Sequence, residues 1–491
     1  MDFLSERNFV AIALLVFSAI FLVFFPHFYT SIDEHTFLKN ALLLRGGSIG
    51  EHDPELACRS TLYNENGFIG GQFIGRSLFL IPFTFFGFDA VMLSGLAIHI
   101  MNALLFYLIL RRLGIDARFT VLYLFFPAML WESRTLYSEL LVLTAFLAAF
   151  YFYTGKSRLE NAAGGLFFGL ASVVRYDAMV GFAAFAAPLV FQDRKKLLEM
   201  LAGFLPVVAL IFLFNSYAYS GPLNAGYGSG IMLLSSLASI SPLTFFAYLA
   251  ILLILIPGLL ASPMFGKKYV PQFLLLSLAY LWLTSIFTDI TAFPLTIDTL
   301  LTARLRYLVP MIGLLLIPYS GMLGGLSEKL GTRREPMFIA MFLVLVAGAA
   351  FASNLHANFT ESRFETFLQI KANVPQDALL IGSSDDCIYS ITSGLERSRY
   401  LNIAPEYDLG PQGKTISIGG QISNAASSGG AYLMYLENSN RSPNTSRRQG
   451  NTNAERKLMD DFINKNEGSL EQVFETQKPN YLKIYKWDGK Q

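Results

Sequence analysis

Two acidic residues, Asp33 and Glu34, follow the first long apolar stretch of the chain. A carboxylate at the edge of a membrane can take a proton from an acceptor hydroxyl, so either residue is a candidate general base. The pattern Ser31-x-x-Glu34 is also typical of a capping box, and acidic residues favour the first turn of a helix. Capping accounts for Glu34 without catalysis. It does not account for Asp33, because a capping box uses one carboxylate.

A second group of candidates lies in the segment 131–139, which contains Glu132, Arg134, Tyr137 and Glu139. One interpretation is a solvated connection in which Glu132 and Arg134 form an exposed ion pair, and such pairs contribute little to stability. Glu139, however, stands at the start of the next apolar stretch. Ionisable residues at membrane depth are costly and usually functional, so Glu139 is a candidate site residue.

Arginines near the ends of apolar stretches are candidates for binding a phosphate. Arg175 and Asp177 join two spans with almost no loop, and Arg175 either pairs with Asp177 or binds a lipid phosphate. Arg304 and Arg306 open a later span on the side where few positive charges are expected. A guanidinium can bind a phosphate through two hydrogen bonds, which gives these two arginines a reason to be there.

The composition indicates a polytopic α-helical membrane protein. Among the 491 residues only 15% are charged, against roughly a quarter in a typical soluble chain, and the mean hydropathy is +0.45. A net charge of +1 argues against a nucleic-acid partner. We interpret residues 9–26 as a retained span, because no small-residue cleavage site follows them.

About eleven apolar stretches approach the length needed to cross a bilayer. They are residues 9–26, 90–110, 118–131, 137–154, 161–175, 178–192, 197–215, 243–262, 270–288, 305–322 and 336–352. Alternate connections are short and basic, at residues 111–112, 156–158, 194–196, 267–268 and 329–334. The positive-inside rule therefore predicts a cytoplasmic N-terminus and an extracytoplasmic C-terminal tail.

We expect a transmembrane catalytic domain over residues 1–352 and an extracytoplasmic α/β domain over residues 353–491. The first outer loop, 27–89, contains two apolar segments at 33–45 and 73–88, which predict interfacial helices. After residue 353 the polar content rises and short elements alternate. The predicted helices are 364–374, 386–393 and 454–465, and the predicted strands are 378–382, 431–436 and 481–487.

The cysteines and histidines give little sign of a covalent or metal centre. Cys58 and Cys387 both fall in predicted outer segments, and the sequence leaves open whether they pair. His27, His35 and His52 lie near the acidic pair but have no metal-ligand spacing on one helix. The sequence thus indicates no cofactor, and it leaves a divalent metal open without indicating one.

Five motifs occur along the first two thirds of the chain. They are Asp33-Glu34 with ALLLRG at 41–46, GRSLFLIPFTFFG at 75–87, Tyr137-Ser-Glu139, GGLFFGLASVVR at 164–175 and RYLVP at 306–310. In order and spacing these motifs resemble those of the protein O-mannosyltransferase-like enzymes of the GT-C superfamily (glycosyltransferase family 39-like). The resemblance covers roughly residues 10–320, and the order of the motifs is more specific than any one of them. The sequence departs from the family at Arg76, where relatives often have Pro or Gly.

This superfamily also includes the aminoarabinose transferase that acts on lipid A. The resemblance implies a multi-pass plasma (cytoplasmic) membrane enzyme with an outer-face active site, which uses a polyprenyl- or dolichyl-phosphate sugar as donor. It implies an inverting hexosyl or pentosyl transferase whose acceptor is a protein, lipid or glycan. The resemblance implies Asp33 as the catalytic base and Glu139 as the second acidic position. From the residues themselves we add Glu34 to the catalytic candidates. The candidates for the donor phosphate are Arg304, Arg306, Arg175 and Arg76, and those around the acceptor are Glu132, Arg134, Asp177 and Tyr137.

The main alternative is a polytopic transporter or flippase of lipid-linked glycans. Such a protein is expected to carry charges near the middle of the bilayer and to show internal symmetry. In this sequence the charged candidates fall instead at predicted span ends on one side. That distribution favours an enzyme.

Overall fold

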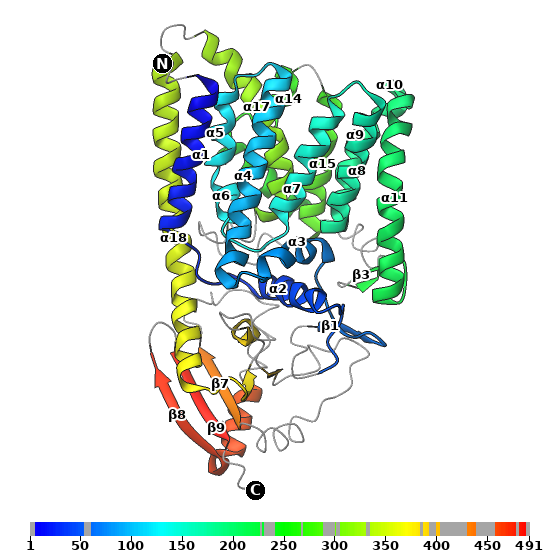
Figure 1. Ribbon diagram of the computed structural model, residues 1–491. Coiled ribbons are helices and arrows are strands. Elements are labelled where there is room, and N and C mark those ends of the chain that lie inside the picture. The colour runs from blue at the N-terminus through cyan, green and yellow to red at the C-terminus, as the bar shows by residue number, and fades with distance from the viewer. Residues whose placement is uncertain are drawn as a thin grey trace.

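The computed structural model describes residues 5–53, 60–225, 228–229, 241–266, 269–287, 300, 305–329, 334–382, 386–391, 399–402, 430–437, 457–477 and 481–487. They form a helical bundle with a small sheet beyond one of its ends, as Figure 1 shows. The predicted polytopic α-helical architecture is confirmed by this arrangement of apolar helices.

Five helices in the described part of the chain are long and apolar enough to cross a membrane. These are α1 (Glu6–Val23), α4 (Phe88–Leu113), α11 (Arg194–Tyr219), α17 (Val309–Glu328, continuing the turn η5, Arg306–Leu308) and α18 (Arg334–Asn373). The remaining helices of the bundle are α5 (Thr120–Leu124), α6 (Pro127–Glu132), α7 (Glu139–Tyr153), α8 (Arg158–Val174), α9 (Met179–Ala186), α10 (Leu189–Gln192), α13 (Pro242–Leu255), α14 (Ser262–Gly266) and α15 (Val270–Phe287), with the 3-10 turns η2 (Ala117–Phe119) and η3 (Tyr176–Ala178). The chain is a multi-pass membrane protein, and eleven crossings stay a prediction.

The predicted span 118–131 is wrong as a single helix. The chain forms the short helices α5 and α6 instead, with a break at Phe125 and Phe126. Pro127 begins α6, and a proline cannot donate the backbone hydrogen bond that a continuous helix needs there. Trp131 and Glu132 at the end of α6 are buried.

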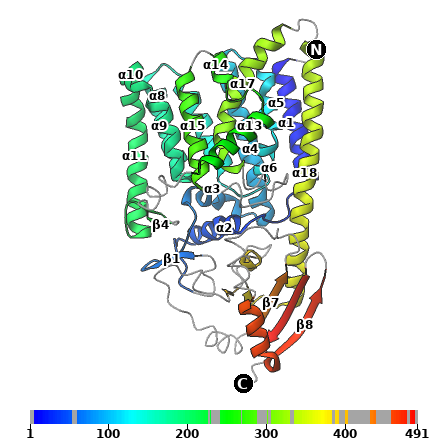
Figure 2. The ribbon, with the colours of Figure 1, turned by 180° about the vertical axis from the view of Figure 1, so that it is seen from behind.

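Two shorter helices, α2 (Ile32–Arg45) and α3 (Ile74–Thr84), lie across the end of the bundle that faces the sheet (Figures 1 and 2). A hairpin of β1 (Ser60–Asn64) and β2 (Gly67–Gly70) connects them, and the sequence analysis missed it. Most of α2 is buried, from Glu34 to Leu43. Its apolar side chains share a core with Phe367 and Tyr389 of the C-terminal part, so protein rather than lipid covers this helix.

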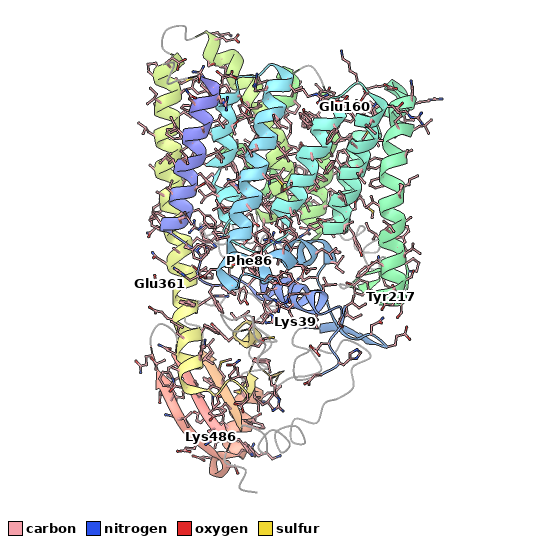
Figure 3. All side chains as sticks on the ribbon, viewed as in Figure 1. Lys39, Phe86, Glu160, Tyr217, Glu361 and Lys486 are labelled. Carbon is pink, nitrogen blue, oxygen red and sulfur yellow. The ribbon has the colours of Figure 1, made fainter. Side chains whose placement is uncertain are left out.

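Figure 3 shows the two ends of the bundle. Glu160, which forms an ion pair with Arg112 at 2.5 Å, lies at the end away from α2. Lys39 of α2 lies at the opposite end, toward the sheet. The predicted basic connections at residues 111–112 and 156–158 are therefore on the far side of the bundle from the acidic pair.

The helix α18 links the bundle to the sheet without a break, across the predicted domain boundary between residues 352 and 353. The predicted separate helix 364–374 is thus the end of α18. Polar residues enter at Ser353 and Asn354, but neither Gly nor Pro interrupts the helix there. The composition change marks the exit from the apolar bundle rather than the end of a helix.

The C-terminal sheet has the strand order β6-β5-β7-β9-β8. Its parallel pairs are β5 with β6 and β5 with β7, and β9 runs antiparallel between β7 and β8. The strands are β5 (Leu379–Gly382), β6 (Tyr400–Asn402), β7 (Ala431–Glu437), β8 (Leu470–Thr476) and β9 (Tyr481–Trp487), and two further short strands, β3 (Asn224–Ala225) and β4 (Gly228–Ser229), form a separate pair after α11.

The three predicted strands match β5, β7 and β9, whereas β6 and β8 were missed. The predicted helix 386–393 is a 3-10 turn, η7 (Asp386–Ser390), and residues 457–465 of the predicted helix 454–465 are helical. A further 3-10 turn, η10 (Glu467–Ser469), precedes β8.

A close crossing of α3 and α8 depends on Gly75. A Cβ at this position would lie 2.6 Å from Val174 Cα and 2.7 Å from Val173 O. Both contacts are with backbone, so neither can yield by a side-chain rotation. The crossing therefore keeps Arg175, which follows Val174, close to the first outer loop.

We expect Gly75→Ala to destabilise the protein by about 1–3 kcal/mol, the range for overpacking a well-packed contact. The measurement is the unfolding midpoint of the purified protein in detergent. Gly325→Ala in α17 is the matched control, because a Cβ there meets no atom within 4 Å. Equal midpoints for the two variants would show that the α3–α8 crossing tolerates a shift.

Candidate active site

Residues from four distant parts of the chain meet at the α2 end of the bundle. Asp33 comes from α2, Glu139 from the start of α7, Arg175 from the end of α8 and Arg306 from η5. Three carboxylate–guanidinium contacts join them directly. The structure thus brings together four of the residues that the sequence analysis singled out.

Arg306 lies between two carboxylates. Its Nε donates to Glu139 Oε1 at 2.6 Å, and its Nη1 lies 3.4 Å from Asp33 Oδ2. The Glu139 side chain is 1% exposed and the Asp33 side chain is 31% exposed. Glu139 therefore holds the guanidinium from inside the protein, while Asp33 is the carboxylate that an incoming molecule can reach.

Arg175 completes the ion-pair network. Its Nη1 donates to the same oxygen, Glu139 Oε1, at 2.8 Å, and its Nε and Nη2 donate to the two oxygens of Asp177 at 2.9 and 3.1 Å. Burial by itself lowers the pKa of Arg175, but the charges of Asp177 and Glu139 outweigh it and raise the pKa. Arg175 therefore stays charged. The Arg175–Asp177 pair that the sequence analysis considered is present, and Glu139 joins it.

Aromatic rings and an amide hold these groups in place. The Arg306 guanidinium carbon lies 3.5 Å from the centre of the Tyr137 ring, and the Arg175 guanidinium carbon lies 5.1 Å from that of Tyr307. Gln72 Nε2 donates to Asp33 Oδ1 at 2.8 Å. Sequence reasoning missed Gln72 and Tyr307. Tyr307 could have been found as the neighbour of Arg306 in the RYLVP segment, whereas nothing in the sequence marks Gln72.

Glu34 has a different environment from Asp33. Its Oε1 accepts hydrogen bonds from Thr30 N at 2.8 Å, from the Thr30 hydroxyl and from Ser31 N at 3.1 Å, and its Oε2 accepts from Leu136 N at 2.8 Å. The residue is 0% exposed. Burial raises the pKa of Glu34, although the hydrogen bonds from Thr30 and Leu136 act to lower it. These contacts give Glu34 a structural role, since it joins the start of α2 to the connection between α6 and α7.

We expect Glu34→Gln to lower stability more than it lowers the activity of the folded protein. The amide group would turn an N–H donor toward at least one backbone N–H, and a buried donor left unsatisfied costs about 1–3 kcal/mol. Thermal unfolding and turnover per folded molecule separate the two effects. Glu361→Gln on the exposed face of α18 is the control. A stable but inactive Glu34→Gln protein would instead assign Glu34 to the chemistry.

Arg76 and Glu132 lie behind the network. Arg76 is fully buried and donates from Nε to Leu136 O at 3.0 Å and from Nη2 to Ser94 Oγ at 3.2 Å. Glu132 is 2% exposed, and among the described residues neither of its carboxylate oxygens has a hydrogen-bond partner. The charges that act on Glu132 are those of Glu139, Arg306, Glu34 and Arg175. Arg76 and Glu132 therefore contribute to the electrostatic field at the site from the protein interior.

Arg134 does not pair with Glu132. In the part of the chain that the structure describes it forms no ion pair, and its guanidinium carbon lies 5.1 Å from the centre of the Phe21 ring on α1. The interpretation of residues 131–139 as a solvated connection with an exposed Glu132–Arg134 pair is wrong. Both side chains are buried, because the chain between α6 and α7 passes through the protein rather than over its surface.

The structure adds none of the remaining candidates to this ion-pair network. Arg304 and Cys58 lie outside the described residues, and Cys387 is disulfide-bonded. His35 Nε2 lies 3.1 Å from Ser390 Oγ, and His27 stacks on Phe364. Within the described residues no group of three potential metal ligands exists.

The arrangement can hold an anion next to a base. Arg306 uses Nε and Nη1 for carboxylates, and its Nη2 makes no hydrogen bond within the described residues. That nitrogen can donate to a phosphate oxygen without breaking the contact with Glu139. A hydroxyl placed at Asp33 would then be beside the same guanidinium.

An apolar groove lies between α13 and α15. Its lining includes Pro242, Phe245 and Phe246 of α13 and Trp282 of α15. The helix α15 also contacts η5, which carries Arg306. The groove therefore offers an apolar surface on a helix that touches the site.

The fold is similar to that of solved membrane proteins of one kind. The chain matches the crystal structure of ArnT from Cupriavidus metallidurans in the apo state with a TM-score of 0.54, at 12% sequence identity and over 97% of both chains. It matches the structure of the same protein bound to undecaprenyl phosphate with a TM-score of 0.56, at the same identity and coverage. No model of a known protein family and no curated protein matches the sequence.

These similarities cover nearly the whole chain, so the fold is shared from α1 to the C-terminal sheet. The polytopic α-helical architecture expected from the sequence is therefore shared with ArnT. At 12% identity the likeness describes the fold, and the activity has to be argued from the site.

Proposed function

We propose that this chain is a membrane glycosyltransferase that moves a sugar from a polyprenyl- or dolichyl-phosphate donor to an acceptor hydroxyl. The observation that carries the proposal is the contact between Asp33 and Arg306 at 3.4 Å, which sets a reachable carboxylate beside a buried guanidinium. The shared fold with ArnT, which has been solved with undecaprenyl phosphate, supports a lipid-phosphate partner.

The proposed reaction is a single displacement at the anomeric carbon. Asp33 takes the proton of the acceptor hydroxyl, and the acceptor oxygen forms a bond to that carbon from the side opposite the phosphate. The bond between the anomeric carbon and the phosphate oxygen breaks, and the lipid phosphate leaves with the electron pair. The configuration is inverted. The leaving group is already anionic, so it needs positive charge rather than a proton.

In this proposal Arg306 stabilises the charge that develops on the leaving phosphate, and Arg175 supports it through their shared partner Glu139. Both guanidinium groups contact Glu139 Oε1, at 2.6 and 2.8 Å. A donor phosphate at Arg306 Nη2 would be a further anion beside this pair of cations, in addition to Glu139, Asp33 and Asp177. The apolar groove between α13 and α15 is a candidate surface for the polyprenyl chain.

We place the active site on the extracytoplasmic face of the plasma membrane. The support is the pattern of basic connections, two of which lie at the end of the bundle opposite α2 (Figure 3). Hexosyl and pentosyl donors both fit the proposed chemistry, and so do protein, lipid and glycan acceptors. No cofactor takes part in the proposed step.

The test is transfer of label from a polyprenyl-phosphate sugar. The full chain is reconstituted in vesicles with a radiolabelled donor and a membrane extract as acceptor source, and products are separated and identified by mass spectrometry. We expect a covalent glycosylated product and free lipid phosphate. A transporter or flippase would move the intact donor across the bilayer without breaking the sugar–phosphate bond, and that outcome would overturn the proposal.

A further inference from the structure

Four buried polar side chains meet where α1, α6 and α18 pack together. They are Trp131 in α6, Arg134 just after α6, and Ser353 and His356 on α18, and none is more than 1% exposed. The α1 and α18 helices lie side by side in Figures 1 and 2, and α6 contacts α18. This cluster is distinct from the Asp33–Arg306 site, whose ion pairs do not include Arg134.

The four side chains are close to one another. The Trp131 and His356 ring centroids are 4.8 Å apart, with the rings nearly perpendicular. Arg134 N donates to Trp131 O at 3.0 Å, so these two residues share one turn, and the charge of Arg134 acts on His356. Ser353 precedes His356 by three residues, which puts both on the same face of α18.

Most of their side-chain polar atoms have no hydrogen-bond partner in the part of the chain that the structure describes. The unsatisfied atoms are Trp131 Nε1, Arg134 Nε and Nη2, Ser353 Oγ and both ring nitrogens of His356. A buried polar group without a hydrogen bond is costly, and native proteins rarely leave several together. The cluster is therefore an incomplete arrangement that a bound species would complete.

The missing species carries negative charge. Arg134 has no carboxylate partner in the described part of the chain, and burial lowers the pKa of its guanidinium to about 9. A buried cation without a counter-charge is strongly destabilising. The indole and guanidinium nitrogens are donors only, and the serine hydroxyl and an imidazole N–H add further donors. Water could satisfy some of these atoms, but it would not neutralise Arg134.

We propose that Trp131, Arg134, Ser353 and His356 form a binding site for a phosphate-type oxyanion between α1, α6 and α18. Charge-assisted hydrogen bonds from a guanidinium to phosphate oxygens are the strong kind, and Arg134 is three residues after Trp131 and acts on His356. The anion comes either from a lipid headgroup or from inorganic phosphate. Once bound, it ties α18, and through it the C-terminal sheet, to the rest of the bundle.

The first test uses the wild-type full chain, purified in a neutral detergent and stripped of bound lipid. Its thermal unfolding is followed while inorganic phosphate is added against chloride at equal ionic strength, and separately with phosphatidylglycerol against phosphatidylcholine. We expect one of the two anions to raise the unfolding midpoint. At a ligand concentration of about 100 Kd the unfolding equilibrium constant falls about 100-fold. Stabilisation by phosphate identifies a free oxyanion, and stabilisation by phosphatidylglycerol alone identifies a headgroup.

The second test is Arg134→Met, which removes the charge and keeps much of the side-chain volume. Without anion we expect this variant to be at least as stable as the wild type, because an unpaired buried cation is gone. With anion we expect the wild type to gain stability and the variant to gain none. His356→Phe should show a reduced response. Arg363→Met is the matched control, since Arg363 lies on α18 against Phe359, outside the cluster. The anion should raise the unfolding midpoint of this variant as much as it raises that of the wild type.

The proposal is overturned if neither anion stabilises the wild type, which would mean that water fills the site. It is also overturned if Arg134→Met responds as the wild type does. If Arg134→Met does not fold, His356→Phe is the deciding variant. A rise of its unfolding midpoint with anion that equals the rise of the wild type would then count against the site. The site is established by a stabilisation of the wild type that Arg134→Met loses and that His356→Phe reduces.

Discussion

Replacing Asp33 by Asn is expected to lower sugar transfer by about 10²–10⁴-fold, the usual contribution of a general base. The amide cannot take the proton of the acceptor hydroxyl. The fold should survive, because Asp33 is the most open carboxylate of the network and an Asn side-chain oxygen can still accept from Gln72. The donor KM should change little.

The measurement is initial rate against donor concentration with the labelled polyprenyl-phosphate sugar. Asp89→Asn is the control, since Asp89 is an exposed acid in the first turn of α4. Its rate should match the wild type. A rate for Asp33→Asn within a factor of two of the wild type would remove Asp33 from the mechanism and leave the site without a reachable base.

Replacing Arg306 by Ala should reduce transfer by about 10²–10³-fold, the loss seen when one group that stabilises a developing oxyanion is removed. Arg306 donates to Glu139 and lies 3.4 Å from Asp33, so its loss removes the cation closest to both carboxylates. Use of the donor should suffer more than use of the acceptor. Arg306→Lys should recover part of the rate, because a lysine supplies the charge without the planar set of donors.

Arg306→Ala also leaves Glu139 buried with Arg175 as its remaining cation, so stability has to be measured beside activity. Turnover is therefore expressed per folded molecule, and kcat/KM is determined separately for donor and acceptor. Arg363→Ala serves as the control for removal of a half-buried arginine. If kcat/KM falls equally for donor and acceptor, Arg306 positions the other residues of the site and does not bind the phosphate.

Local sequence was sufficient for the parts of this protein that depend on nearby residues. Long apolar runs predicted most helices of the bundle, because a segment that crosses a membrane has to satisfy its backbone internally and cover itself with apolar side chains. The positions of Asp33, Glu139, Arg175 and Arg306 at the ends of such runs indicated that they could meet. The predicted strands β5, β7 and β9 are likewise short, apolar and rich in β-branched or aromatic residues.

The sequence could not distinguish Asp33 from Glu34, although the two are neighbours. Successive residues of a helix point in different directions, and only the packed structure shows that Glu34 faces Thr30 and Leu136 while Asp33 faces Gln72 and Arg306. The same holds for Glu132 and Arg134, which look like an ion pair in sequence and are separated by the turn between them.

Residue types and their spacing thus determined by themselves that this is a membrane protein with charged groups gathered at one end of its helices. The tertiary structure alone decided which of those charges touch, because Glu139, Arg175 and Arg306 are joined by contacts between residues far apart in the chain. It also decided which charges form no ion pair within the described residues, as for Arg134. Whether a buried charge is neutralised depends on the atoms packed around it, and those atoms come from helices that no local pattern brings together.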